Sequence, residues 1–534
     1  MSLPRSRDYV VRPAVETDAD AIVGLFRAAY GDGYVHPQVY DPHEVKRMIF
    51  DEATLLLVAE HEPSGRLIGT AGVLCEMGAY SDLVGEFGRL VVHPEWRGLG
   101  IGSRFMRERL ERVGTRLHVG FAEVRVGNAA SASISLAHGF VPVGALPQKL
   151  VFRGSREHAG LLVRHFGDAL ELRRNHPRIV PEAHYLADLA LRGVGLRPDV
   201  ILDDEAPAYP YGDGYRLEEL SDHGYSSLLR IERGRVRSRE VFGPQRLHYG
   251  LFKLAASDSQ YVVARDGPRV VGALGYMRDD VERVVRVFEV IQEHEAVVRP
   301  LFEALEHRCL EGSVVAAEVD VDADATRMQR TLLELGYEPV AYIPAMAFHE
   351  VERVDVLKMY RLFQPLEELP FEAPEPLLSV GRRVLEQFAA VEIRPRLARL
   401  MDELEVCSEL TEEQSTQLVA AFEPRSIEAG TRLFEVGDAA DAMMLIVAGE
   451  VRVEAEGVEI GVVGPGECLG EVAFLNDAPH AASAVAVARL EVGILTRAKL
   501  DGIVRRRPDI GSTVYRNLAR GLGRKLRRAD GLSS

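Results

Sequence analysis

Cysteine is scarce in this sequence, and long apolar runs are missing. The four cysteines, Cys75, Cys309, Cys407 and Cys468, lie far apart and form no CxxC pair. This spacing predicts neither a disulfide framework nor a metal site, and it fits free thiols in a reducing compartment. Because no apolar run reaches about 18 residues and no apolar signal segment opens the chain, we expect a cytoplasmic protein without a membrane partner.

Positive charge is also in short supply, and most of it is arginine. The 534 residues hold 81 Asp and Glu against 64 Lys and Arg, of which only 6 are lysine, so the formal net charge is −17. That balance disfavours nucleic acid as a partner of the whole chain. Hydrophobic residues at 47% and charged residues at 27% are typical of globular proteins. At about 150 residues per domain, the length predicts three to four folded units.

The first 150 residues alternate strand and helix patterns, which predicts an α/β domain. The expected elements are a strand over 8–13, a helix over 18–30 capped by Asp18, a hairpin of strands 55–60 and 67–75, and a strand over 90–92. The last strand runs into a glycine-rich turn and a helix.

Two parts of the chain resemble each other at a nearly constant offset. The segment 136–147 recurs at 333–344, 197 residues later, and a second, shorter match lies at an offset of 203 residues. Two matches at such similar offsets predict that residues 211–352 are a diverged copy of residues 1–150.

Two connecting segments flank the second copy. Residues 151–210 are expected to form a partly helical linker, with helices over 157–174 and 182–193. Residues 353–408 are expected to form a helical connector rich in Arg and Leu.

Residues 409–534 differ in character from the rest of the chain. Several short β patterns separated by glycine follow a helical pattern over 412–422, which predicts a small barrel or jelly roll. A final helix carries an apolar stripe at Ile510, Val514, Leu518, Leu522 and Leu526. The stripe fits core packing, and it fits equally the contact surface of a homodimer.

The strongest motif lies between Arg97 and Gly102. Glycines allow a left-handed backbone and a close approach to a ligand. The first N–H groups of the following helix have no partner inside the helix, and the helix dipole favours an anion there. This turn therefore predicts a site for a phosphate or pyrophosphate.

The motif resembles the acetyl-CoA loop of the GNAT N-acetyltransferase superfamily, with Arg97, Gly100 and Gly102 in its three fixed places. A second GNAT hallmark is matched by Asn128, then Ile134, then Gly139 and Phe140. The resemblance implies that acetyl-CoA is bound by the strand before the loop, by the loop and by the residues after it. The implied residues are Leu90, Val92, Arg97, Gly98, Leu99, Gly100, Ile101, Gly102, Ser103 and Asn128.

Acyl transfer to an amine requires a neutral amine, and therefore a base. In GNAT enzymes a Glu on the strand before the motif often has this role, and Glu86 falls near that position. We expect partial burial to raise the pKa of Glu86 toward a useful range. The family's Tyr acid falls at Ser135, a departure from the pattern, and Ser133 and His138 are the nearby alternatives.

The second copy lacks the glycine loop. Glu293, His294 and Glu295 stand near the place where phosphates would sit, and carboxylates there would repel CoA. We expect a GNAT-like fold that binds no cofactor and that either packs against the first copy or shapes its acceptor channel.

The C-terminal region resembles the cyclic-nucleotide-binding family. Gly437 and Gly449 occupy two of its turn positions, and a phosphate-binding cassette follows at Gly470, Glu471, Val472, Ala473, His480, Ala481 and Ala482. The resemblance implies cyclic AMP or cyclic GMP as an effector. However, His480 replaces the family's Arg, and a histidine is mostly neutral at pH 7. Cyclic-nucleotide binding and a degenerate barrel are both consistent with that change.

The predicted architecture combines α/β and β domains: two GNAT-like α/β domains followed by a cyclic-nucleotide-binding β-barrel, or jelly roll, with flanking helices. The predicted parts are a GNAT domain at 1–150, a linker at 151–210, a degenerate copy at 211–352, a connector at 353–408 and a barrel at 409–534. The predicted activity is acetyl-CoA-dependent N-acetyl transfer to a small-molecule or protein amine, regulated at the barrel. A non-catalytic sensor or scaffold is the alternative.

Overall fold

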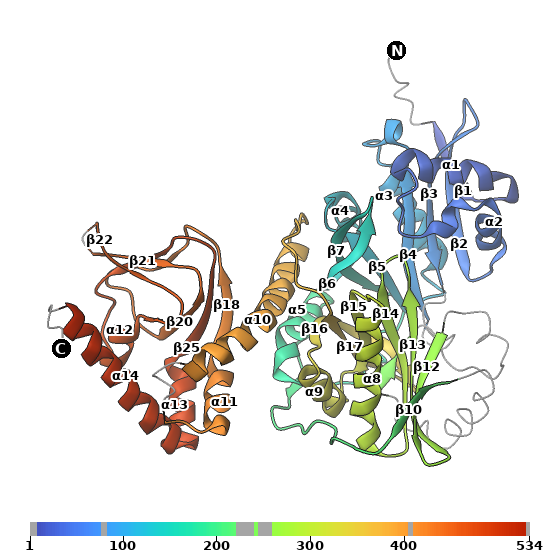
Figure 1. Ribbon diagram of the computed structural model, residues 1–534. Coiled ribbons are helices and arrows are strands. Elements are labelled where there is room, and N and C mark those ends of the chain that lie inside the picture. The colour runs from blue at the N-terminus through green and yellow to red at the C-terminus, as the bar shows by residue number, and fades with distance from the viewer. Residues whose placement is uncertain are drawn as a thin grey trace. The chain divides into compact units, whose positions relative to one another are not determined.

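The computed structural model describes residues 8–75, 83–220, 240–243, 259–403, 409–455 and 457–529. The chain divides into two compact units, Met1–Val384 and Leu385–Ser534, which are described separately below (Figure 1). Among the described residues, no helix is both long enough and apolar enough to cross a membrane.

The N-terminal part of the first unit, here called the first copy, is a seven-stranded sheet with helices. Its elements are β1 (Tyr9–Pro13), α1 (Ala19–Tyr30), α2 (Pro42–Phe50), β2 (Thr54–His61), β3 (Arg66–Leu74), β4 (Val84–Val92), η3 (Pro94–Trp96), α3 (Ile101–Val113), β5 (Val119–Arg125), α4 (Ala129–Ala137), β6 (Val141–Phe152) and β7 (Ser155–His165). The strands lie in the order β1-β2-β3-β4-β5-β7-β6, and only β4 and β5 run parallel. The strands and the helix expected in this region are confirmed.

The second copy repeats this plan. Its elements are β10 (Arg216–Glu219), β12 (Ser259–Asp266), β13 (Arg269–Asp279), β14 (Val284–Gln292), η6 (Glu295–Val297), α8 (Val298–Glu311), β15 (Ala316–Asp322), α9 (Thr326–Glu334), β16 (Glu338–His349) and β17 (Glu352–Leu362), with an extra strand β11 (Val241–Phe242). The strand order is again β10-β12-β13-β14-β15-β17-β16. The two copies lie side by side and share one sheet, because β16 pairs with β6 where Ala341 meets Gly144 (Figure 1).

One predicted helix is wrong. Residues 157–174 contain β7, whose six central residues are all buried because the strand lies between β5 and β6 with both sheet faces covered. The first copy therefore continues to His165, beyond the predicted boundary at residue 150. Its counterpart β17 likewise occupies the start of the predicted connector and extends the second copy to Leu362.

The rest of the linker and the connector follow the prediction more closely. Helix α5 (His184–Gly193) lies at the second helix expected in the linker, between the short parallel strands β8 (Arg178–Ile179) and β9 (Ile201–Leu202). Helix α10 (Leu377–Glu403) forms about half of the connector, with 27 residues.

Helices cover both faces of the first copy's sheet. Helices α1 and α2 pack on one face against Leu56, Val58 and Val91, whereas α3 packs on the other face against Leu57 and Ile68. Side chains alternate between the faces along a strand, so neighbouring residues of β2 serve different cores. The face of α1 and α2 is called the α1/α2 face below.

Asp18 stands at the start of α1, but its side chain does not cap that helix. Its carboxylate instead accepts hydrogen bonds from the Val15 N–H (2.8 Å) and from the Arg12 guanidinium (2.7 Å). The expected cap is therefore wrong: the Asp18 carboxylate stabilises the turn that leads into the helix and the link to β1.

The second unit contains a two-sheet β barrel with helices. Its elements are α11 (Glu412–Ala421), β18 (Glu423–Ile427), β19 (Arg432–Phe434), β20 (Ala442–Ala448), β21 (Val451–Ala455), β22 (Val458–Val463), β23 (Cys468–Leu469), α12 (Glu471–Asn476), β24 (Ser483–Ala486), β25 (Leu490–Thr496), α13 (Arg497–Arg506) and α14 (Pro508–Ala529). The sheets have the orders β18-β25-β20-β23 and β19-β24-β21-β22, as the jelly-roll prediction requires.

The apolar stripe of α14 packs inside this unit. Ile510, Val514 and Leu518 are buried against Leu500 of α13 and other core residues. The side chains of Leu522 and Leu526 lie outside the described residues. The described part of the stripe therefore serves the core, and the homodimer stays a prediction.

Candidate functional site

Strands β4 and β5 of the first copy separate to form a wedge. They pair only where Val84, Gly85 and Glu86 meet Val119, Gly120 and Phe121, although both strands continue further. The divergence starts before a bulge in β4, where Arg89 has a left-handed backbone with φ 52°. An extra residue in a strand bends it and breaks its pairing. The two strands therefore diverge beyond Glu86 and Phe121.

The glycine loop ends at the start of α3. Gly98 and Gly100 have φ values of 80° and 77°, which side chains rarely adopt, and a Cβ placed on either would meet no atom within 4 Å. The first intrahelical bond joins Arg104 N to Gly100 O at 3.0 Å, so the amides of residues 101–103 precede it. The loop is thus open to a ligand and lined by amides, which fits a pyrophosphate.

Residues beside the glycine loop contact other parts of the protein. Arg97 is exposed, and its Nε donates to Val92 O at 3.3 Å. At Gly102 a Cβ would lie 2.7 Å from Ile134 of α4, so this glycine serves helix packing. Leu90 and Val92 are half-buried on β4, whereas Leu99 is 37% exposed and Ile101 is buried.

Arg109 is a buried residue that sequence reasoning missed. It lies on α3, is 1% exposed, and donates from one nitrogen to Gly72 O (3.1 Å) and to Gly88 O (3.3 Å). Gly72 and Gly88 are strand partners next to the bulge at Arg89. The Arg109 guanidinium therefore connects α3 to the place where β4 and β5 begin to separate. Burial lowers the pKa of Arg109 to about 9, which leaves it cationic at neutral pH.

Glu86 lies on the α1/α2 face. Its carboxylate accepts a hydrogen bond from Arg89 at 2.6 Å. Burial raises the pKa of Glu86, but the Arg89 guanidinium and His36 together outweigh burial, so the pKa lies below its ordinary value. The expected rise in the pKa of Glu86 is therefore wrong, because the bulge in β4 brings Arg89 into an ion pair with this carboxylate.

Aromatic side chains gather on the same face. Tyr30 stacks on Tyr34 with ring centroids 5.0 Å apart and meets Phe152 edge-on at 5.8 Å. Tyr34 also contacts His36, whose pKa falls to about 4 because of burial and the nearby Arg89. The end of α1, the segment after it and the β6–β7 turn thus line the side of the wedge where Glu86 lies.

The candidate residues around α4 cap this helix, lie buried within it or contact the helix after the glycine loop. Ser135 is 2% exposed and its carbonyl accepts from the Phe140 N–H, so its place in the helix is a buried one. Asn128 caps α4 by accepting from the Ala130 N–H at 3.0 Å. His138 bonds Ser103 at 3.3 Å through Nε2 and Ile134 O at 2.8 Å through Nδ1. Of the candidate acids, His138 is hydrogen-bonded to α3, the helix after the glycine loop.

The wedge of the second copy is filled by its own chain. Strands β14 and β15 pair from Val284 to Val287 and then separate, and β11 pairs with the freed edge of β15. A Cβ at Gly243 would lie 2.2 Å from Phe288 of β14, so the inserted segment is packed tightly. In the described part of the first copy, no strand occupies the equivalent gap.

The acidic turn of the second copy is neutralised locally. Glu293 pairs with Arg269 at 2.7 Å, and Glu295 pairs with Arg327 at 2.7 Å. These ion pairs offset the charge of the acidic turn, whereas the β11 insertion occupies the gap between β14 and β15.

The second unit places its cassette at the short helix α12. Gly470 precedes this helix with φ 79°, Glu471 is 7% exposed, Val472 is half-exposed and Ala473 is buried. His480 is 7% exposed and stacks on Phe434, with ring centroids 3.6 Å apart and planes 8° from parallel.

His480 nevertheless lies at the phosphate end of the cassette. A Cβ on Gly470 would be 3.1 Å from its Cε1. Burial lowers its pKa, so the ring is neutral at pH 7 and offers no permanent charge. Ala481 and Ala482 follow it into β24.

Two family models match parts of the chain. Residues 52–142 match the acetyltransferase (GNAT) domain, and residues 424–507 match the cyclic nucleotide-binding domain. The first match contains the glycine loop, and the second contains the phosphate-binding cassette.

The curated relatives are similar to the C-terminal part. The cyclic AMP receptor protein of Thermus thermophilus is 35% identical over 126 residues, which are 23% of this chain and 56% of the relative. The cAMP-dependent protein kinase regulatory subunit of Yarrowia lipolytica is 36% identical over 98 residues, 18% of this chain and 26% of the relative. The chain thus spans about half or less of the length of these relatives.

Among solved structures, a ribosomal-protein-S5-alanine acetyltransferase from Vibrio fischeri has 21% identity and a TM-score of 0.27. It covers 30% of this chain and 96% of its own. The catabolite activator protein of Thermus thermophilus has 33% identity and a TM-score of 0.22, over 24% of this chain and 60% of its own.

Proposed function

The chain combines a GNAT acetyltransferase domain with a cyclic-nucleotide-binding domain, and from this premise we propose that it is an acetyl-CoA-dependent N-acetyltransferase. We propose further that a cyclic nucleotide bound to the C-terminal domain sets its rate. The observation that carries the first proposal is the open glycine loop of the first copy beside an open wedge. The loop supplies amides for a pyrophosphate, and the separation of the two strands begins at Glu86, the candidate base.

In this proposal acetyl-CoA supplies the acetyl group as a thioester. The amides of residues 101–103 and Arg97 hold its phosphates, and Leu90 and Val92 lie beside its thiol arm. The acceptor amine approaches on the α1/α2 face, where the Glu86 carboxylate takes its proton directly or through water. As the N–C bond forms, the C–S bond breaks, and the sulfur leaves as a thiolate that takes a proton from water.

Arg89 has a positioning role in this proposal. It holds the Glu86 carboxylate at 2.6 Å, which keeps Glu86 ionised and oriented at the vertex of the wedge. An ionised carboxylate can accept a proton from an ammonium group, so the low pKa keeps the base in its working form across neutral pH. The buried Ser135 has no part in this scheme.

The proposed regulation uses Glu471 and His480 as ribose and phosphate contacts. A ligand changes the rate only if it binds one conformation of the protein better than another. Because a neutral histidine interacts more weakly with a cyclic phosphate than a charged arginine would, we expect weak binding of cyclic AMP and cyclic GMP.

A non-catalytic sensor is the second candidate, and two observations favour it. Ser135 replaces the expected acid and is buried, and His480 carries no permanent charge. The open loop at Gly98 and Gly100 opposes it, because a relic would not need left-handed glycines facing free space.

Calorimetry and a thiol-release assay separate these candidates. We expect acetyl-CoA to bind the full chain and to release CoA when an amine is present, and cyclic AMP or cyclic GMP to change that rate. If the full chain binds no acetyl-CoA, the proposal that it is an acetyltransferase is excluded. Unchanged rates and CoA affinity at saturating cyclic AMP and cyclic GMP would exclude only the regulation.

A further inference from the structure

A cavity lies between the two copies, with walls from both. Its empty space, mouth included, is about 810 Å³. Val84, Phe121 and Glu123 come from β4 and β5 of the first copy, and the second copy contributes residues of β14, β15, β16 and β17. Side chains of both copies therefore face one shared space.

The cavity lies beside the candidate base. Phe121 is the strand partner of Glu86, and Val84 precedes Glu86 by two positions on β4, so both point to the α1/α2 face with it. Arg286 of the second copy lines the cavity and also contributes to the low pKa of Glu86. A molecule in the cavity thus lies next to the vertex of the wedge.

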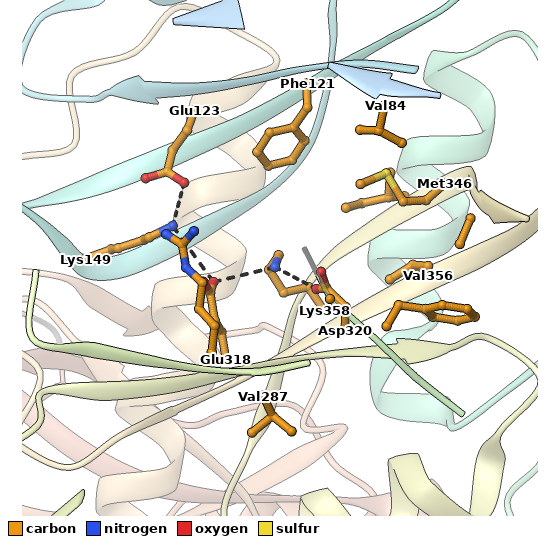
Figure 2. A pocket seen from close by; sticks show the side chains of 15 residues that line it. Val84, Phe121, Glu123, Lys149, Val287, Glu318, Asp320, Met346, Val356 and Lys358 are labelled. Atoms are coloured by element: carbon orange, nitrogen blue, oxygen red, sulfur yellow. Dashed lines mark hydrogen bonds and ion pairs between the residues drawn. The ribbon is translucent and has the colours of Figure 1, made fainter. Parts of the chain in front are cut away.

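One wall of the cavity carries charges of both signs (Figure 2). Its charged residues are Glu123, Lys149, Arg286, Glu318, Asp320 and Lys358, so three cations face three carboxylates. Lys149 lies 2.5 Å from Glu123, Lys358 lies 2.6 Å from Asp320, and Glu318 is shared by Lys149 (3.9 Å) and Lys358 (3.5 Å). Arg286 pairs with Glu318 as well.

This balance of charge selects against a polycation. The carboxylates are already paired with lysine or arginine, so a ligand with several positive charges would face three fixed cations without a compensating surplus of acid. Lys149 and Glu318 are only 2% and 4% exposed, so these charges are poorly screened by solvent. The wall can still give and accept hydrogen bonds.

The opposite wall is apolar. Figure 2 shows Val84, Met346 and Val356 on the side away from the charged residues. Phe121 and Val287 also line the cavity and are buried in the folded chain. Contact with such a wall favours a ligand with an apolar body.

Resting on the proposed function, we propose that this cavity binds the non-reacting part of the acceptor, and that the acceptor is a small amphipathic amine. Such a molecule has an apolar body, hydrogen-bonding groups along one side and no positive charge beyond its reacting amine. The second copy, with its own wedge filled, would then form the specificity wall of the first copy's site.

The test compares acceptors with the full chain at saturating acetyl-CoA. The probes are 2-phenylethylamine and tyramine as amphipathic amines, spermidine as a polycation, and a lysine-containing peptide. We expect kcat/KM to be about tenfold or more higher for one of the amphipathic amines than for spermidine or the peptide.

Substitutions at Met346 then test whether the cavity is the site. Met346→Trp fills it and is expected to raise KM for the preferred amine about tenfold while KM for acetyl-CoA stays unchanged. Met346→Ala enlarges it and is expected to shift the preference toward bulkier amines. The matched control is Met277→Trp, at a half-buried methionine of β13 outside the cavity, and thermal unfolding reports whether each variant folds.

The outcomes separate this inference from the proposed function. A chain that binds no acetyl-CoA would overturn both. If acetyl-CoA binds but spermidine or the peptide is the best acceptor, the inference is overturned and the enzyme stands. The same conclusion follows if folded Met346→Trp and Met346→Ala leave both KM and preference for the amine unchanged.

Discussion

Replacing His480 with arginine tests the second unit most directly. His480 stacks on Phe434 and lies against Gly470 at the phosphate end of the cassette, and burial lowers its pKa. His480→Arg would introduce a permanent charge where the structure offers a neutral ring. The variant should therefore bind cyclic AMP or cyclic GMP more tightly than the natural chain.

The magnitude follows from two opposing terms. A hydrogen bond to a charged group contributes about 1.5–3 kcal/mol, whereas losing an aromatic stack such as that on Phe434 costs about 0.5–1.5 kcal/mol. The difference between the two ranges is about 0–2.5 kcal/mol and is centred near 1 kcal/mol, which corresponds to roughly fivefold tighter binding. An arginine that stacks on Phe434 in its turn would keep the gain at the upper end.

Calorimetric titration at pH 6 and pH 8 measures the cyclic-nucleotide affinity of the natural chain and the variant. In the natural chain the anionic ligand favours protonated His480, so the pKa of His480 is higher in the complex and affinity rises as pH falls. The arginine variant should show no such dependence, and the control His176→Arg, at an exposed histidine, should behave like the natural chain. Equal affinities of all three proteins at both pH values would refute a phosphate contact at His480.

Three further predictions concern the first unit. Gly100→Ala imposes a strain of about 1–2 kcal/mol at φ 77°, and if the loop moves to relieve it, KM for acetyl-CoA should rise roughly five- to thirtyfold in steady-state assays. The control Gly24→Ala, in open space within α1, should leave KM unchanged and raise stability by about 1 kcal/mol. Arg173→Met should lower the free energy of unfolding by about 3–5 kcal/mol in urea titrations, because it leaves the buried Asp355 carboxylate without the guanidinium 2.6 Å away. Adding Asp355→Leu should recover part of that loss, and no recovery would contradict the uncompensated-charge argument. Because the pKa of Glu86 is lowered, the fall of kcat/KM toward acidic pH should follow protonation of the acceptor amine rather than of Glu86. Glu86→Gln should therefore reduce kcat by about 10²–10⁴ without shifting that part of the pH profile.

Much of the fold could be predicted because its signals are local. The glycine turn after β4, the repeat of 136–147 at 333–344 and the short β patterns of the second unit are each readable within a few residues. Strands β7 and β17 were not predicted as strands because six or more consecutive buried residues fit a helix and a central strand equally well. Only the position between two other strands decides that case.

The site was predictable in position but less so in chemistry. Sequence placed Glu86 before the loop, but the pKa of Glu86 depends on Arg89, which a bulge brings to 2.6 Å. Arg109 has its role through hydrogen bonds to Gly72 and Gly88, which are distant in the sequence. Strand β11 likewise pairs with a distant strand, β15. A pattern of residue types carries no information about such contacts.

The junction of β6 and β16 has a consequence for how the protein behaves on dilution. A cavity built by two separate chains would come apart as their concentration fell. Here the two halves are joined in one polypeptide and one sheet, so each half meets the other at a fixed effective concentration. The rate per molecule should therefore stay constant from micromolar to nanomolar protein, whereas a site shared between chains would lose activity. Because both copies belong to one chain, the cavity between them stays assembled at any protein concentration.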